Sequence, residues 1–129
     1  MAKILALGGD GIGPEILAEG LRVLDRVTEQ AEISLEIDQG VLHGASWDLH
    51  GTFCTDGVLD MARASDAVLV GAVGGPDWDG IRVPGGAECQ DGLTYLRYHL
   101  QTYLGLRPAR CWPKLRHRSS IRPVSYTHL

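Results

Sequence analysis

The sequence has 129 residues, of which 44% are hydrophobic and 22% charged, and these proportions exclude collagen-like, disordered and coiled-coil chains. Its length and its net charge of −4 predict one ordinary globular domain. The N-terminus lacks the apolar core of a signal peptide and no run of eighteen apolar residues occurs, so we expect neither secretion nor membrane spanning.

The first forty residues predict a β-α-β unit. Residues 3–8 are an apolar run that ends in glycine, the pattern of a buried strand. A helix is expected to begin at Pro14, because apolar residues recur at helical spacing through residues 16–28. Residues 33–38 alternate between apolar and polar, as in a half-buried strand. This order of elements predicts a parallel sheet.

The next segment predicts a loop, a helix and a second buried strand. Residues 40–56 are rich in glycine and predict a loop with a short helix near 45–49. Thr55 or Asp56 is expected to cap a helix that ends near residue 63. Residues 66–73 form an almost continuous apolar run, typical of a strand covered on both faces.

A glycine-rich loop and a last helix complete the predicted elements. Residues 74–91 contain five glycines and two prolines, which predicts a long loop. A leucine at every third or fourth position between residues 93 and 104 predicts a helix that Gly105 ends. No internal repeat or low-complexity tract occurs.

Two glycine-rich segments follow predicted strands. Residues 8–15, Gly-Gly-Asp-Gly-Ile-Gly-Pro-Glu, open a helix, where free N–H groups can bind an anion, or they form a tight structural turn. They differ from the Rossmann fingerprint because Pro14 stands in place of a glycine. Residues 74–80 follow a buried strand, where ligands of parallel sheets collect, or they form a surface loop in which Trp78 packs locally.

Two arginines are candidates for binding an anion. Arg97 has no acidic residue three or four positions away on its predicted helix, and an unpaired guanidinium suits a carboxylate or a phosphate. Arg107 precedes Pro108, which favours extended backbone. The alternative for each is a solvated surface arginine.

The remaining charged residues and the histidines carry weaker signals. Residues 1–91 have a net charge of −11 and residues 92–129 one of +7, but residues 107–122 contain a single aromatic residue and no nucleic-acid motif, so we expect no nucleic-acid partner. The five histidines lack ligand spacing and are interpreted as structural or exposed: His43, His50, His99, His117 and His128.

Three cysteines, odd in number and without metal-ligand spacing, favour free thiols in a reducing compartment. They are Cys54, Cys89 and Cys111. We therefore expect a cytoplasmic protein.

Three segments in order resemble the isocitrate/isopropylmalate β-decarboxylating dehydrogenases, with closest likeness to the isopropylmalate type. They are Gly-Asp-Gly-Ile-Gly-Pro-Glu at 9–15, the run 67–80 that ends in Gly-Gly-Pro-Asp-Trp-Asp-Gly, and Gly92-Leu-x-x-Leu-Arg97 followed by Arg107-Pro-Ala109. The likeness spans about residues 3–115. It implies an α/β fold of the isopropylmalate dehydrogenase type, with a parallel or mixed sheet and flanking helices, distinct from a Rossmann fold.

The resemblance implies a reaction and a set of binding residues. Members oxidise a malate-type 2-hydroxy acid with NAD and a divalent metal, Mg²⁺ or Mn²⁺, and then release carbon dioxide. Arg97 and Arg107 match the arginines that bind a substrate carboxylate, and Leu93 matches the position that contacts the variable group of the substrate. Eight residues match the stretch beside the nicotinamide: Gly75, Pro76, Asp77, Trp78, Asp79, Gly80, Glu88 and Gln90.

Some positions depart from the family pattern. Gln90 replaces an acidic residue, with Glu88 two positions earlier, Gly105 replaces a common asparagine, and Asp77 stands where lysine is frequent. These departures leave tartrate, D-malate or isocitrate as alternative substrates to 3-isopropylmalate.

The resemblance also implies an N-terminal fragment of a longer homodimeric enzyme of leucine biosynthesis. Family members are longer, and their catalytic residues and metal ligands match no position here, so we expect this chain to be inactive alone. Residues 1–105 would form the first half of the large domain, 106–123 the start of the small domain and 124–129 a non-native tail. The alternative is a free-standing, non-catalytic anion-binding module, which predicts a cooperatively folded monomer, whereas a fragment predicts poor solubility.

Overall fold

A three-stranded parallel sheet forms the centre of the protein. The computed structural model describes residues 1–108 and 112–118. Strand β1 (Ala2–Gly9) lies between β2 (Leu35–Gly40) and β3 (Ala67–Ala72), and Ile4 pairs with Ile37 on one side and with Ala67 on the other. The predicted parallel α/β architecture is confirmed.

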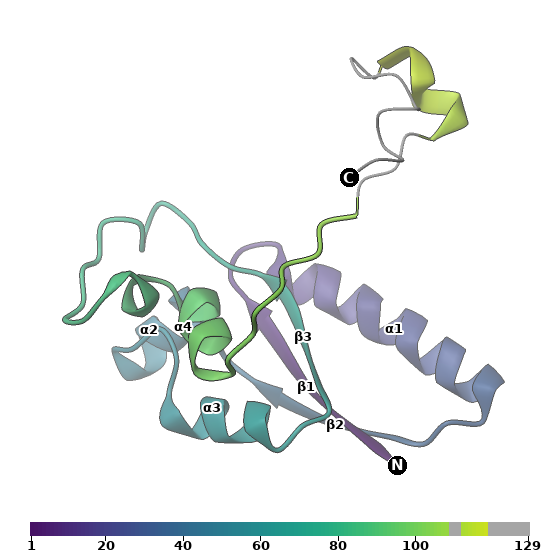
Figure 1. Cartoon of the computed structure of the whole chain (residues 1–129), viewed down its shortest axis with the longest axis horizontal. Coiled ribbons are helices and arrows are strands. Elements are labelled where there is room, and N and C mark those ends of the chain that lie inside the picture. The colour runs from purple at the N-terminus through teal and green to yellow at the C-terminus, as the bar shows by residue number, and fades with distance from the viewer. Residues whose placement is uncertain (109–111, 119–129) are drawn as a thin grey trace.

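The helices flank the two faces of this sheet (Figure 1). Helix α1 (Gly13–Ala31) packs on β1 and β3 from one side. The other side is covered by α3 (Asp56–Arg63) and α4 (Gly92–His99), and α2 (Gly44–His50) lies at the carboxyl ends of the strands. Two short 3₁₀ helices, η1 (Ala87–Gln90) and η2 (Pro113–Arg118), complete the elements described.

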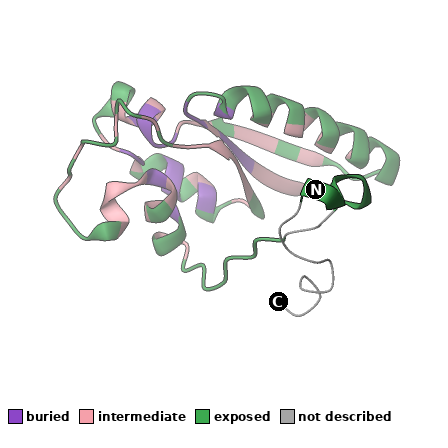
Figure 2. Ribbon diagram, turned by 90° about the horizontal axis from the view of Figure 1, so that it is seen from above, coloured by how far each residue is buried: buried purple, intermediate pink, exposed green. Residues whose placement is uncertain are grey.

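The hydrophobic core lies between β1 and helices α3 and α4. Leu5 and Leu7 of β1 point to this side, where they meet Val58 and Leu59 of α3 and Leu96 of α4, and all five are buried (Figure 2). Figure 2 also shows that most of α1 is exposed. The buried core is therefore formed mainly by β1, α3 and α4.

Two predicted boundaries are wrong. Helix α4 ends at His99 instead of reaching Gly105, because Gln101 adopts a left-handed conformation (φ 55°) and its N–H donates back to the carbonyl of Tyr98. Leu104 is consequently exposed. Strand β2 begins at Leu35, so Ile33 lies before the strand and is exposed.

Strand β3 differs from its prediction in burial. None of its residues is fully buried, and it is an outer strand of the sheet within the described part of the chain. The prediction of a strand covered on both faces is therefore wrong for the described residues. The expected tail at 124–129, together with Cys111, lies outside the described residues.

Candidate functional site

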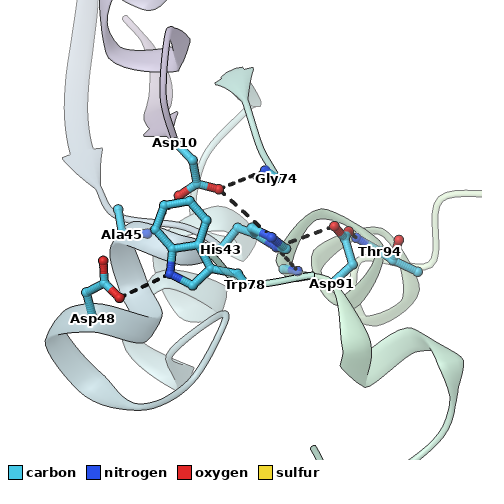
Figure 3. Close-up of polar contacts among 9 residues, drawn as sticks. Asp10, His43, Ala45, Asp48, Gly74, Trp78, Asp91 and Thr94 are labelled. Carbon is cyan, nitrogen blue, oxygen red and sulfur yellow. Dashed lines mark hydrogen bonds and ion pairs between the residues drawn. The ribbon is translucent and has the colours of Figure 1, made fainter. Parts of the chain in front are cut away.

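The three parallel strands end at one edge of the sheet, where Asp10 connects the loops that follow them (Figure 3). Asp10 comes directly after β1 and is 5% exposed. Its Oδ1 accepts the N–H of Ala45 in α2 at 2.7 Å, and its Oδ2 accepts the N–H of Gly74 at 2.8 Å. One carboxylate therefore fixes the start of α2 and the loop after β3 relative to β1.

Glycines allow the backbones of β1, α1 and β3 to approach closely beside Asp10. Gly9 has a positive φ of 74°, and a Cβ there would overlap the carbonyl oxygen of Ala72. A Cβ on Gly71 would overlap the carbonyl oxygens of Gly8 and Gly13. Residues 8–15 are expected from the sequence to form an anion-binding loop or a tight structural turn. Close packing of the backbone explains these glycines by the second interpretation.

Trp78, one of the residues expected beside the cofactor, points into the protein. Its indole Nε1–H donates to Asp48 Oδ1 at 3.1 Å, and the ring lies where a Cβ on Gly44 would be. The indole therefore attaches the loop after β3 to α2, as Figure 3 shows. Five other residues of this loop are expected to contact the cofactor. Gly75 is half-buried, and the remaining four are exposed: Pro76, Asp77, Asp79 and Gly80.

Gln90 is occupied by contacts within its own loop. Its side chain accepts from the N–H of Val83 at 3.2 Å and donates to the carbonyls of Val83 at 2.8 Å and Gly86 at 3.3 Å. Glu88 is half-buried, and its carboxylate accepts the thiol of Cys89 at 3.7 Å. The structure thus assigns Gln90 the task of closing the turn at 83–90, two residues before α4.

The three residues expected to bind substrate lie on or just after α4. Leu93 is half-buried and Arg97 is exposed. Both Nη2 of Arg97 and Nη1 of Arg107 lie 3.6 Å from the point that a Cβ on Gly105 would occupy, so the two guanidinium groups converge on Gly105. Within residues 1–108 and 112–118, neither guanidinium forms a hydrogen bond or an ion pair. Two adjacent uncompensated cations favour a bound anion.

A groove of about 770 Å³ runs along α4 beside the free edge of β3. Leu93, Leu96 and Arg97 line one wall, and Val68 and Val70 of β3 line the other. The groove therefore combines an apolar surface with the guanidinium of Arg97, the pair of features that a small branched acid requires.

A second pocket, of about 560 Å³, lies on the other side of α4 and contains two thiols and a phenol. Cys54, Cys89 and Tyr95 line it. Burial, with a smaller contribution from Asp56, raises the pKa of Cys54 to about 11. Burial also raises the pKa of Tyr95. Both groups are therefore neutral at physiological pH.

His43 is a residue whose task the sequence does not predict. It is buried between β2 and α2 at φ 58°, and its ring stacks on Phe53 with centroids 4.7 Å apart. Its Nδ1 accepts the N–H of Gly92, the first residue of α4, at 3.2 Å. The contact joins residues 49 positions apart, and no local pattern signals it. Asp10 carries a weak signal, an aspartate between glycines just after a buried strand.

The described residues contain neither a metal-binding cluster nor a membrane-spanning helix. Among residues 1–108 and 112–118, no three His, Cys, Asp or Glu side chains come together in a way that could hold a metal ion. In the same part of the chain, no helix is both long and apolar enough to cross a membrane.

The structure is that of an α/β protein. Its candidate site for binding a carboxylate lies at the end of α4, where Arg97 and Arg107 meet. The sequence model of the isocitrate/isopropylmalate dehydrogenase family matches residues 3–128. The chain therefore belongs to the isocitrate/isopropylmalate dehydrogenase family.

Curated relatives and solved structures agree with this assignment. The 3-isopropylmalate dehydrogenase of Brucella melitensis is 44% identical over 121 residues, and that of Pseudomonas fluorescens is 46% identical. Each alignment covers 94% of this chain, which spans about a third of the length of these relatives (32% and 33%).

Among solved structures, a β-decarboxylating dehydrogenase from Thermococcus kodakarensis in its apo form superposes with a TM-score of 0.61 and 28% identity. The superposition covers 80% of this chain and 28% of the Thermococcus kodakarensis chain. An isocitrate dehydrogenase from Methylococcus capsulatus superposes with a TM-score of 0.51 and 30% identity, covering 68% of this chain and 23% of its own.

Proposed function

We propose that the chain is the substrate-binding part of an NAD-dependent β-decarboxylating dehydrogenase that acts on 3-isopropylmalate in leucine biosynthesis. The observation that supports this most strongly is the convergence of the Arg97 and Arg107 guanidinium groups on Gly105, without carboxylate partners in the described residues. The family assignment and the identity to 3-isopropylmalate dehydrogenases support the choice of substrate.

In this proposal the two arginines bind one carboxylate of the substrate, because a guanidinium offers parallel N–H donors that match a carboxylate. Leu93 lies one turn before Arg97 in the same groove and contacts the isopropyl group. An apolar contact beside a charged one orients the acid, since the carboxylate and the hydrocarbon end cannot exchange places without leaving the guanidinium groups unpaired.

The proposed cofactors are NAD and Mg²⁺ or Mn²⁺. We assign contact with NAD to Gly75, Pro76, Asp77, Asp79, Gly80 and Glu88, with Trp78 and Gln90 holding the loops in shape. NAD bound beside these residues would supply the hydride acceptor for oxidation of the substrate hydroxyl. The described residues offer no set of metal ligands, so no step of the reaction is assigned to a metal on this part of the chain.

The proposed enzyme is cytoplasmic and homodimeric, and residues 1–105 belong to its large domain while 106–123 begin its small domain. The chain alone is proposed not to complete the reaction. Purified 129-residue chain mixed with 3-isopropylmalate, NAD and Mg²⁺ should therefore produce no NADH, and production of NADH would contradict this part of the proposal.

Substrate binding can be tested without turnover. Titration of ¹⁵N-labelled chain with 3-isopropylmalate should shift the Nε–H signals of Arg97 and Arg107. Replacement of either arginine by alanine should weaken binding about tenfold, the effect of losing a charge-assisted hydrogen bond of about 1.5 kcal/mol. Arg22→Ala is the matched control, because Arg22 pairs with Glu19 on the exposed face of α1. Equal affinity of all three variants would contradict the proposal.

The branch of the family can be tested at Leu93. Leu93→Ala should weaken binding of 3-isopropylmalate about tenfold and leave binding of D-malate unchanged, because only the former has an apolar group to bury. Equal loss for both acids would contradict a contact between Leu93 and the isopropyl group, and with it the choice of 3-isopropylmalate over tartrate, D-malate or isocitrate.

A non-catalytic anion-binding module is the second candidate, and the same two unpaired arginines favour it. It predicts that inorganic phosphate or sulfate competes with 3-isopropylmalate at equal concentration, and that Leu93→Ala has no effect on either ligand.

A further inference from the structure

Helix α4 carries both Leu93 and Arg97, yet it spans only Gly92–His99, about two turns. Leu96 is 2% exposed and anchors the middle of the helix in the core. Leu93, Tyr95 and Leu100 are partly buried and pack against the same core. Apolar contacts are non-directional whereas a hydrogen bond is directional, so polar contacts at the first turn of α4 determine where Arg97 points.

The first turn of α4 has two such polar contacts. The side chain of Asp91 accepts the N–H of Thr94 at 2.6 Å within the start of the helix itself, and His43 connects this turn to a distant part of the chain. The N–H of Gly92 donates to His43 Nδ1 at 3.2 Å, and it is one of the N–H groups that a helix leaves without an internal partner. The backbones also touch, since a Cβ on Gly92 would lie 2.6 Å from the carbonyl oxygen of Phe53 and 2.9 Å from the nitrogen of His43. The start of α4 therefore rests directly on His43.

The imidazole is itself held on several sides, as Figure 3 shows in part. Its ring stacks on Phe53 and meets the edge of Trp78, with centroids 4.7 Å and 6.5 Å away. Two carboxylates face its nitrogens: Asp10 Oδ2 lies 4.0 Å from Nε2, and Asp91 Oδ2 lies 3.4 Å from Nδ1. A neutral ring that accepts the Gly92 N–H at Nδ1 must carry its proton on Nε2, toward Asp10.

The backbone conformation at His43 indicates that the contacts of its side chain stabilise the fold at this position. Its φ of 58° and ψ of −123° form a conformation that glycine adopts readily and that strains a residue with a Cβ. A buried residue kept in such a conformation is favoured only if its contacts offset the strain. The acceptor for Gly92 is one contact that glycine could not supply.

We propose that His43 is a positioning residue, which holds the first turn of α4 through Nδ1 and thereby aims Arg97 at the proposed substrate carboxylate. The inference rests on the proposed function for the role of Arg97, whereas the bond between His43 and Gly92 stands on the geometry alone.

Two substitutions separate this role from simple packing. His43→Phe keeps an aromatic ring on Phe53 but removes the acceptor. His43→Asn removes the ring but places Oδ1 where Nδ1 lies, and asparagine is among the residues that tolerate positive φ. A packing role predicts that the Phe variant behaves like the original chain and the Asn variant does not. A positioning role predicts the reverse.

The experiment uses the full 129-residue chain at pH 8. In the original chain, long-range ¹H–¹⁵N correlations should show the His43 proton on Nε2. His43→Phe should speed hydrogen exchange at the Gly92 amide. It should weaken binding of 3-isopropylmalate by up to about fivefold, because the energy of one hydrogen bond limits the cost of restoring the direction of α4 on binding. His43→Asn should retain slow exchange and affinity. The free energy of unfolding in urea, measured for each variant, is the control. It tests whether a loss of affinity follows from a loss of stability.

The outcomes distinguish the two proposals. A His43→Phe chain with unchanged Gly92 exchange and unchanged affinity would overturn the positioning role. If Arg97→Ala still weakens binding about tenfold, the proposed function is left standing. A proton found on Nδ1 would overturn the positioning role as well. If Arg97→Ala binds 3-isopropylmalate like the original chain, the proposed function fails and the aiming of Arg97 fails with it.

Discussion

Asp10 is the side chain on which the strand ends depend. It is buried and its two oxygens accept backbone N–H groups from α2 and from the loop after β3. A carboxylate that accepts such bonds holds its neighbours more strongly than a neutral acceptor does. Because Trp78 and His43 lie beside these same loops, the position of α4 depends indirectly on Asp10.

Replacement of Asp10 by alanine should therefore lower the free energy of unfolding by about 2 kcal/mol, since it leaves two N–H groups in part-buried contacts without their acceptor. Urea denaturation followed by circular dichroism measures this loss. Asp25→Ala on the exposed face of α1 is the control and should stay within about 0.5 kcal/mol of the original chain. A loss at Asp10 no larger than at Asp25 would contradict this role.

The thiols of Cys54 and Cys89 should react at different rates. Burial raises the pKa of Cys54 to about 11, and only the thiolate is nucleophilic, so iodoacetamide at pH 8 should modify half-buried Cys89 well before Cys54. Peptide mapping by mass spectrometry resolves the two sites. In 6 M urea the difference should vanish; a difference that persists there would not come from the fold.

The same pKa shift affects stability at alkaline pH. The folded chain holds the Cys54 proton more strongly than the unfolded chain does, because the pKa rises from 9.0 to about 11. Stability from this group is complete below pH 9 and is lost as the pH rises through about 11. Cys54→Ser should flatten this part of the curve of unfolding free energy against pH.

Among the elements, β1, α1 and β3 meet so closely that their contact excludes side chains. A Cβ on Gly71 of β3 would overlap the carbonyl oxygens of Gly8 and Gly13. Backbone atoms cannot rotate away as the end of a side chain can, so the strand or the helix would have to move. The approach of α1 to the sheet is therefore fixed by glycine at this end.

Gly71→Ala should destabilise the chain by about 3 kcal/mol through this overlap. Gly20→Ala is the matched control in α1, where a new Cβ would meet Leu69 at an ordinary 4.0 Å. That substitution should stabilise the chain by about 0.5 to 1 kcal/mol, because alanine loses less backbone entropy in a helix. Thermal unfolding of the two variants should shift in opposite directions, and shifts of the same sign would contradict the assigned packing.

For the whole molecule, the central place of β1 determines where the structure is most persistent. Strand β1 pairs on both sides and supplies Leu5 and Leu7 to the core, whereas β2 and β3 are outer strands in the described residues. The chain leaves this body after α4 along an exposed segment, as Figure 1 shows. Stability should therefore decrease outward from β1.

Hydrogen exchange followed by NMR should confirm this gradient. The amides of Leu5, Ala6 and Leu7 should exchange slowest, because every N–H of β1 faces a neighbouring strand. In β3, amides that face β1 should be protected and alternate ones should exchange quickly. Uniform protection along β3 would indicate that another strand, from a second copy of the chain, pairs with its free edge.

Local sequence patterns predict much of the fold and also indicate Arg97 of the candidate site. Helical spacing of apolar residues predicts α1 and the start of α4, and short apolar runs predict the strands. The cap signal predicts α3, and Thr55 caps it as expected by accepting the N–H of Val58. Arg97 was identified as a guanidinium without an acidic neighbour on its helix, and the structure adds Arg107 beside it. The end of α4 was missed because the leucine spacing continues past the left-handed turn at Gln101.

Periodicity and motif order lie along the chain, so they suffice to predict the parallel α/β class, the family resemblance and the residues proposed to bind substrate. The contacts of Trp78 and Gln90 within the loops, of Asp10 at the strand ends and of His43 with α4 emerge only in the folded chain. Those contacts join the end of β1 to Gly74, 64 residues later, and His43 to Gly92, 49 residues later. A hydrogen bond depends on distance in space, which no local pattern encodes.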